Sequence, residues 1–154
     1  MHSRRFNQQR SVEISHLRAG LVTVALAAGL ALAAPAFAAS VTFRAELKGA
    51  NVVPPTASSA SGYLNATYDT QSRRLTWTGS HSDLSSRVRG IHFHGPARPN
   101  ENAGSVQGIE SLSKGSATLS EAEAADLIAG YWYVDVHTRA HPQGEIRGQV
   151  MRGK

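Results

Sequence analysis

Short segments in which apolar and polar residues alternate constrain the fold of this chain more than any other sequence feature. Successive side chains of a β-strand point to opposite faces of a sheet, so this period of two predicts strands with one buried face. Turn-forming residues separate seven such segments, which span residues 41–47, 62–68, 74–78, 88–94, 115–119, 131–137 and 145–150. A parallel sheet would need a helix at each crossover, and most of these connections have no helical pattern. We therefore predict an all-β fold, a single antiparallel β-sandwich.

One short helix is predicted near residues 121–129. Ser120 and Glu123 have the spacing of a capping box, in which each side chain accepts a hydrogen bond from the backbone N–H of the other residue. The residues that follow are good helix formers, and Gly130 is a natural stop. Residues 97–108 contain Pro, Asn and Gly and are predicted to form a surface loop.

The first 38 residues have the pattern of an export signal. Four arginines and one glutamate precede an uncharged stretch rich in Ala, Leu and Val at residues 19–32, and residues 36–38 form an Ala-x-Ala cleavage site. Residues 3–6 resemble part of a twin-arginine signal, so Sec and twin-arginine export both stay open. We predict a signal peptide over residues 1–38 and a periplasmic or secreted domain over residues 39–154, with no membrane span after cleavage.

The net charge of +5 depends on that N-terminal segment. The segment holds four of the 16 Lys and Arg residues and one of the 11 Asp and Glu residues, which leaves 12 basic and 10 acidic residues and a net charge of +2. No Lys/Arg block remains to follow a phosphate backbone, so we expect no nucleic-acid partner. The chain has no cysteine, which excludes disulfides, thiolate metal sites and iron–sulfur clusters. Any metal would be held by imidazole and oxygen.

A His-x-His pair in the predicted strand 88–94 is the sharpest chemical feature of the chain. His92 and His94 would project from the same face of that strand, and a sheet could bring His137, near the end of a later strand, beside them. Three imidazoles without a thiolate suit Cu(II) or Zn(II), with a position left open for water. The alternative is an ordinary surface pair of hydrogen-bonded histidines. His81 fits a turn residue better than a ligand. His141 is a possible additional residue of the site, which could hydrogen-bond a ligand or simply be solvated.

Three motifs resemble those of the CHRD domain family, which is named after chordin. They are residues 43–55 (FRAELKGANVVPP), residues 90–96 (GIHFHGP), and residues 130–138 (GYWYVDVHT) followed by 142–149 (PQGEIRGQ). The resemblance covers residues 41–150 and implies a secreted or periplasmic β-domain of a family whose activity is mostly unassigned. A single copy gives no reason to transfer the growth-factor antagonism of chordin.

The histidine arrangement also resembles the copper side of Cu,Zn superoxide dismutase, an exported Greek-key β-sandwich. That resemblance implies copper-type ligation by His92, His94 and His137. A bridging histidine, a His/Asp zinc loop and the disulfide of that enzyme have no counterparts here. An enzyme is therefore the weaker hypothesis, and its activity would be copper-dependent redox chemistry of the dismutase type.

Three further residues are predicted to support the histidines. Glu145 and Arg147 alternate on the last predicted strand, where they could pair near the site or form a surface ion pair. Thr138 could orient His137 through a hydrogen bond.

These observations predict an exported protein that binds a transition metal, copper before zinc, through His92, His94 and His137. The alternative is a structural or interaction module with structural histidines, which meets a protein or glycan partner at an edge strand or at the 97–108 loop.

Overall fold

The structure is a computed structural model that describes residues 39–153. The predicted signal peptide of residues 1–38 lies outside the described residues. Among the described residues, no helix has both the length and the apolar character needed to cross a membrane.

The regular structure of residues 39–153 consists of nine strands, one α-helix and one short 3-10 helix. The strands are β1 (Ser40–Lys48), β2 (Ser61–Asp69), β3 (Arg74–Ser82), β4 (Val88–His94), β5 (Ser105–Ile109), β6 (Lys114–Thr118), β7 (Tyr133–Thr138), β8 (Ile146–Gln149) and β9 (Met151–Arg152). The helices are η1 (Gly49–Asn51) and α1 (Glu121–Ile128). The predicted all-β fold with one short helix is confirmed, with β5 and β9 in addition to the seven expected strands.

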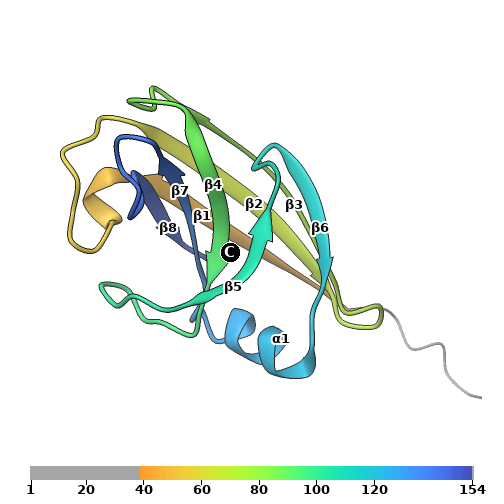
Figure 1. Cartoon of the computed structure of the whole chain (residues 1–154). Coiled ribbons are helices and arrows are strands. Elements are labelled where there is room, and N and C mark those ends of the chain that lie inside the picture. Colours follow the sequence, from red (N-terminus) through yellow and green to blue (C-terminus); the bar gives the residue numbers. More distant parts are fainter. Residues whose placement is uncertain (1–38, 154) are drawn as a thin grey trace, which may run out of the picture. The chain divides into compact units, whose positions relative to one another are not determined.

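The strands pair antiparallel in one sheet, in the order β5-β4-β7-β8-β1-β2-β3-β6, with β9 beside β1. Two halves of four strands meet where β8 joins β1. The pair of Lys48 with Arg147 makes this join, and β9 adds two further pairs with β1. The sheet curls until β5 and β6, which residues 110–113 connect, nearly close it (Figure 1). Because β6 pairs with β3 only after the chain has formed β4 and β5, the connection is a Greek key. The predicted sandwich is thus present as two halves of one nearly closed sheet.

The hydrophobic core lies inside the curled sheet and uses one face of each long strand. In β1 the side chains of Phe43, Ala45 and Leu47 are buried while their neighbours are not, as the period of two predicts. Trp77 of β3 meets Phe93 of β4 edge to face, with ring centroids 5.4 Å apart, so the two halves pack directly on each other. Since Phe93 faces inward, its neighbours on β4 project outward.

The helix α1 begins and ends where its capping residues predict. Ser120 accepts from the N–H of Glu123 at 3.3 Å, and the Glu123 carboxylate accepts from the N–H of Ser120 at 2.7 Å. Beyond the last turn, Gly130 has φ +79°, a conformation that glycine adopts without strain. Ala124 and Leu127 are the buried residues of the helix and anchor it on the core.

Two predicted boundaries were wrong, and strand pairing explains both. The last four residues of the predicted loop 97–108 belong to β5. They form a strand because the edge of β4 has unpaired backbone groups, with which β5 forms hydrogen bonds. The predicted strand 74–78 extends to Ser82 because β2 pairs with it along its whole length. His81 therefore lies exposed on a strand and not in a turn.

Candidate metal centre

The pairing of β4 with β7 places a cluster of polar side chains on the outer face of the sheet. His92 lies opposite Asp135 in the register, while His94 lies opposite Tyr133 and Gly90 opposite His137. Because β4 and β7 each turn alternate residues outward, these side chains share one face. The two strands therefore bring together the three histidines that the sequence singled out, and they add an aspartate.

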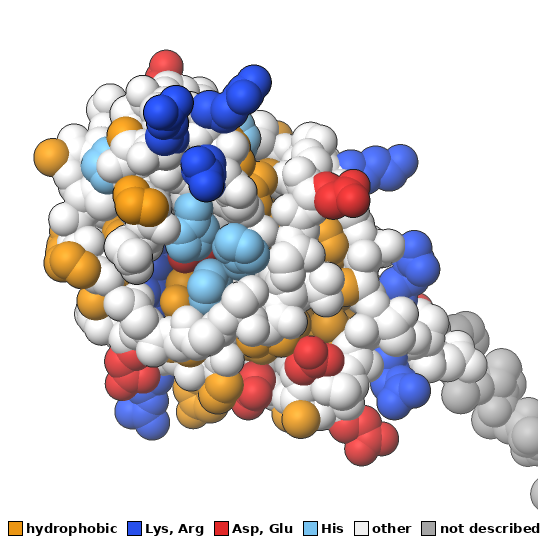
Figure 2. Space-filling model, viewed as in Figure 1, with side chains coloured by type: hydrophobic (Ala, Val, Ile, Leu, Met, Phe, Trp, Pro, Cys, Tyr) orange, Lys and Arg blue, Asp and Glu red, His pale blue; other side chains and the backbone are white. Residues whose placement is uncertain are grey.

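The four potential ligands form a compact group. One ligand atom from each of His92, His94, Asp135 and His137 lies within 4.8 Å of all the others. The ring centroid of His92 is 5.0 Å from that of His137 and 5.7 Å from that of His94. Histidine side chains gather at one place on the molecular surface in Figure 2. The predicted meeting of His92, His94 and His137 is present in the structure.

Asp135 is the residue on which the imidazoles converge. Its Oδ1 lies 2.9 Å from Nε2 of His137 and 3.2 Å from Nε2 of His94, and the residue is only 5 % exposed. Burial raises the pKa of Asp135, but the adjacent imidazoles of His137 and His94 outweigh this effect and hold the pKa below its usual value. The carboxylate is therefore ionised and provides a buried negative charge for a cation.

The Nδ1 atoms of two imidazoles, which point away from the cluster, contact backbone carbonyls. Nδ1 of His94 lies 3.0 Å from the carbonyl oxygen of Ala103, and Nδ1 of His137 lies 2.9 Å from that of Pro142. A carbonyl oxygen only accepts, so each Nδ1 carries a proton. In the neutral imidazoles, the lone pairs of both Nε2 atoms then face the cluster, which is the orientation of a metal-binding histidine.

This arrangement places hydrogen-bond acceptors in direct contact with one another. With Nδ1 protonated, a neutral His94 or His137 directs a lone pair at the carboxylate of Asp135. Such a contact needs a second proton on the imidazole or a cation between the atoms. Asp135 raises the pKa of His137 through their hydrogen bond, as expected when a proton fills this place. Nε2 of His94 is buried and makes no hydrogen bond.

His92 is the fourth member of the group, and its ring lies between two glycines, Gly90 and Gly108. A Cβ on Gly90 would lie 2.7 Å from Cε1 of the His92 ring, so the ring can occupy this position only beside a glycine. Gly108 pairs with His92 from β5 on the other side. Burial lowers the pKa of His92, and His137 adds to the effect, so the ring is neutral and can donate a lone pair. Its Nδ1 is buried without a hydrogen-bond partner.

Tyr133 and Arg147 support His94 from the side. The rings of His94 and Tyr133 are stacked, with centroids 4.8 Å apart and an interplanar angle of 3°. The guanidinium of Arg147 lies 3.5 Å from the centroid of the Tyr133 ring. Arg147 also donates to Asn102 Oδ1 at 3.0 Å and to the carbonyl of Glu101 at 2.7 Å. Burial lowers the pKa of Arg147. The stack connects the cluster to the loop that precedes β5.

The predicted pairing of Glu145 with Arg147 is absent, because each side chain is buried among other partners. Glu145 accepts from Thr138 Oγ1 at 2.6 Å, from Ser58 Oγ at 2.7 Å, and from the N–H and Oγ of Ser85 at 2.7 and 2.9 Å. Burial raises the pKa of Glu145, but these hydrogen bonds outweigh it and lower the pKa to about 2. Glu145 thus ties together three segments that lie far apart in the sequence.

Thr138 has other hydrogen-bond partners than the predicted one, and His141 lies outside the four-residue group. Thr138 donates to Glu145 and accepts from the N–H of His141 at 3.2 Å, while the side chain of His137 is oriented by Asp135 and Pro142. Thr138 therefore acts on the loop after β7 and not directly on the imidazole of His137. His141 does not belong to the four-residue group.

Asp135 is the member of the four-residue group that the sequence patterns did not single out. It stands two positions before His137 on the same predicted strand, so the alternation that paired His92 with His94 would also have placed Asp135 beside His137. The signal was present within one strand. The register against β4, which decides that Asp135 faces His92, is a tertiary property.

The cluster can be reached from outside. A cavity of about 370 Å³ is lined by His92 and His137 together with Arg89, Arg139 and Pro142, among others. The arrangement thus offers three imidazole nitrogens, one carboxylate oxygen and an approach for a small ion or ligand. Such a donor set can bind a divalent transition metal.

Comparison with known proteins identifies the family. The profile of the CHRD domain matches residues 43–150, and these residues contain the whole cluster. Curated proteins and solved structures give no match. The match covers most of the chain and agrees with the three motifs noted in the sequence. The chain belongs to the CHRD domain family.

Proposed function

We propose that this protein binds one transition-metal ion, copper before zinc, through His92, His94 and His137, with Asp135 as an oxygen ligand. The observation that carries the proposal is the contact of two imidazole Nε2 atoms with one buried carboxylate oxygen, at 2.9 and 3.2 Å. Both Nδ1 atoms contact carbonyl oxygens and so carry protons, which leaves a lone pair on each Nε2. A cation between these Nε2 atoms and the Asp135 carboxylate would remove the repulsion between acceptors as well as a proton does.

The donor set decides which metals suit the site. Three imidazoles and one carboxylate favour Cu(II) and Zn(II) over Ca²⁺ and Mg²⁺, which prefer sites made of oxygen alone. For ligands of this type Cu(II) binds more tightly than Zn(II). Metal–nitrogen bonds of about 2.0–2.1 Å allow two ligands of one ion to be at most about 4.2 Å apart. All ligand atoms lie within 4.8 Å of one another, so any pair wider than about 4.2 Å would have to close on binding.

The proposal includes export of the protein. The basic, apolar and Ala-x-Ala pattern of residues 1–38 supports a secretory signal, and the absence of cysteine makes the domain independent of disulfide formation in an oxidising compartment. The protein would then meet its metal in the periplasm or outside the cell.

Titration of the untagged protein with Cu(II) and with Zn(II), by calorimetry and by EPR for copper, tests the metal site. We expect one ion per chain and a Cu(II) spectrum with hyperfine coupling to imidazole nitrogen. His92→Ala and His94→Ala should each weaken binding by about a hundredfold, since each removes one of four ligands. His81→Ala is the matched control, because His81 lies exposed on β3 outside the cluster.

The outcomes separate the metal site from a structural role. If the histidines only hold segments together, the His92 and His94 variants will change thermal stability while the native protein shows no stoichiometric metal binding. Binding that all three variants retain equally would also contradict the proposal, since the ion would then lie elsewhere.

A further inference from the structure

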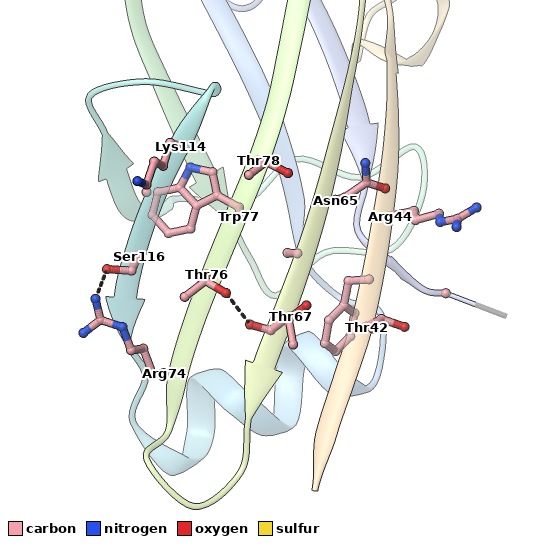
Figure 3. Close-up of a pocket in the computed structure, with 14 residues that line it drawn as sticks. Thr42, Arg44, Asn65, Thr67, Arg74, Thr76, Trp77, Thr78, Lys114 and Ser116 are labelled. Carbon is pink, nitrogen blue, oxygen red and sulfur yellow. Dashed lines mark hydrogen bonds between the residues drawn. The ribbon is translucent and has the colours of Figure 1, made fainter. Parts of the chain in front are cut away.

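A second concave surface lies on the outer face of β1, β2, β3 and β6. A groove of about 800 Å³ crosses these strands, and its lining shares no residue with the metal cluster. The strand register arranges its polar residues in two rows. The rows are Thr42, Thr67, Thr76 and Ser116, and Arg44, Asn65, Thr78 and Lys114. Figure 3 shows these side chains on the four strands.

The groove is positively charged. Arg44, Arg74 and Lys114 line it, and no acidic residue is among its lining residues. The nearby carboxylates of this face are engaged elsewhere. Glu46 pairs with Lys48 at 3.2 Å, and Asp69 accepts from the backbone and hydroxyl groups of the turn that follows it. The three cations thus face solvent without a carboxylate partner in the groove.

The cations flank a stretch of neutral hydrogen-bonding groups. Arg44 and Lys114 end one row, and three strand spacings place their backbones about 14 Å apart. Asn65 and Thr78 lie between them, and both are exposed. Arg74 donates to Ser116 Oγ at 2.7 Å at the β6 side of the groove. A ligand of matching form is extended, carries separated negative charges and has hydroxyl groups between them.

This surface fits a polysaccharide better than a nucleic acid or a protein. Both aromatic residues of the lining are buried, with Phe43 1 % and Trp77 5 % exposed, so the groove offers no platform on which nucleobases could stack. The lining also exposes no large apolar side chain to form the core of a protein interface. Hydroxyl, amide and cationic side chains are the groups that bind sugar hydroxyls and carboxylates.

We propose that the groove binds an acidic polysaccharide of the uronate class, in which each anionic sugar carries one carboxylate and several hydroxyl groups. The three cations among six neutral polar side chains match that mixture of charge and hydroxyls. The arginines pair with carboxylates, and the two rows bind the sugar hydroxyls between them.

Calorimetry with polygalacturonate oligomers tests this proposal, with the full chain in EDTA so that carboxylates cannot bind through a metal. At an ionic strength of about 0.15 M we expect binding to polygalacturonate and none to neutral dextran. The double variant Arg44→Ala/Lys114→Ala should weaken binding by about tenfold or more. Arg87→Ala/Arg98→Ala, which removes the same charge at exposed positions outside the groove, should stay within about twofold of the native protein.

A third variant separates recognition of hydroxyls from charge alone. Thr78→Val keeps a β-branched residue at an exposed strand position and removes one hydroxyl, so it should weaken binding to polygalacturonate by about threefold. The proposal is overturned if polygalacturonate does not bind, if both double variants lose affinity equally, or if polyphosphate or single-stranded DNA binds as tightly as polygalacturonate. Each double variant should unfold at the native temperature, because its substituted side chains are exposed.

Discussion

Asp135 and the three histidines around it illustrate how much of a candidate metal site depends on single contacts. The buried carboxylate holds two imidazoles at 2.9 and 3.2 Å, and carbonyl oxygens fix the tautomers of both rings. The histidines could be predicted from the sequence because residues i and i+2 of a strand share a face. The partners of Glu145 could not, because Ser58 and Ser85 lie 87 and 60 residues away along the chain.

Gly90 provides a test at the scale of one residue. Gly90→Ala would place a methyl group 2.7 Å from Cε1 of His92 and would force the ring away from the cluster. We expect copper affinity to fall by about tenfold while the fold is retained, since the clash is with a side chain and not with backbone. Calorimetry measures the effect, and Gly104→Ala is the control, because a Cβ there would meet no atom within 4 Å. Native affinity in Gly90→Ala would show that the position of His92 is irrelevant to binding.

Individual elements were predicted well where their patterns are local. The capping box of α1 and the alternation of β1 and β2 are sequence properties, and the structure confirms them. β5 was missed because its apolar residues, Val106 and Ile109, do not follow the period of two and a glycine lies between them. The segment becomes a strand because the edge of β4 is free to pair. The packing of the loops near Glu145 could not be predicted either, because a carboxylate that they share holds them together.

Glu145 makes the packing of those loops dependent on pH. Its pKa is lowered from 4.5 to about 2, so the ionised carboxylate stabilises the fold at neutral pH, and this stabilisation disappears as the pH falls from about 5 towards 2. The corresponding loss of unfolding free energy is on the order of 3 kcal/mol. Urea unfolding of the metal-free protein across this range measures it. Glu145→Gln should be less stable at pH 7 and lose the part of the acid dependence that Glu145 contributes, whereas Glu110→Gln, at an exposed position, should behave as the native protein. An unchanged acid profile in Glu145→Gln would refute this role.

At the scale of the whole molecule, the curled sheet separates two outward faces with different chemistry. The β4–β7 face carries the histidines and a buried carboxylate, whereas the β1-β2-β3-β6 face carries cations and hydroxyls. The all-β class could be predicted from strand periodicity. The near closure of the sheet depends on long-range pairs such as β3 with β6 and β4 with β7, which no local pattern encodes.

Export can be tested on the whole protein as cells make it. We expect the protein isolated from the periplasm or the medium to begin at Ala39, after cleavage behind the Ala-x-Ala site at residues 36–38. N-terminal sequencing or intact-mass measurement decides this, and replacing Ala36 and Ala38 by bulky residues should leave the precursor uncleaved. A mature protein that retains Met1 would contradict the predicted signal peptide.

A crystal structure of the copper-loaded protein, with data collected at the copper absorption edge, would show whether His92, His94, His137 and Asp135 bind one metal ion. We expect one strong anomalous peak per chain, about 2 Å from Nε2 of His94 and of His137, with the Asp135 carboxylate at its side. Copper located at another site would contradict the proposed metal site. So would crystals with no peak between these four residues, grown from protein that binds stoichiometric copper in solution.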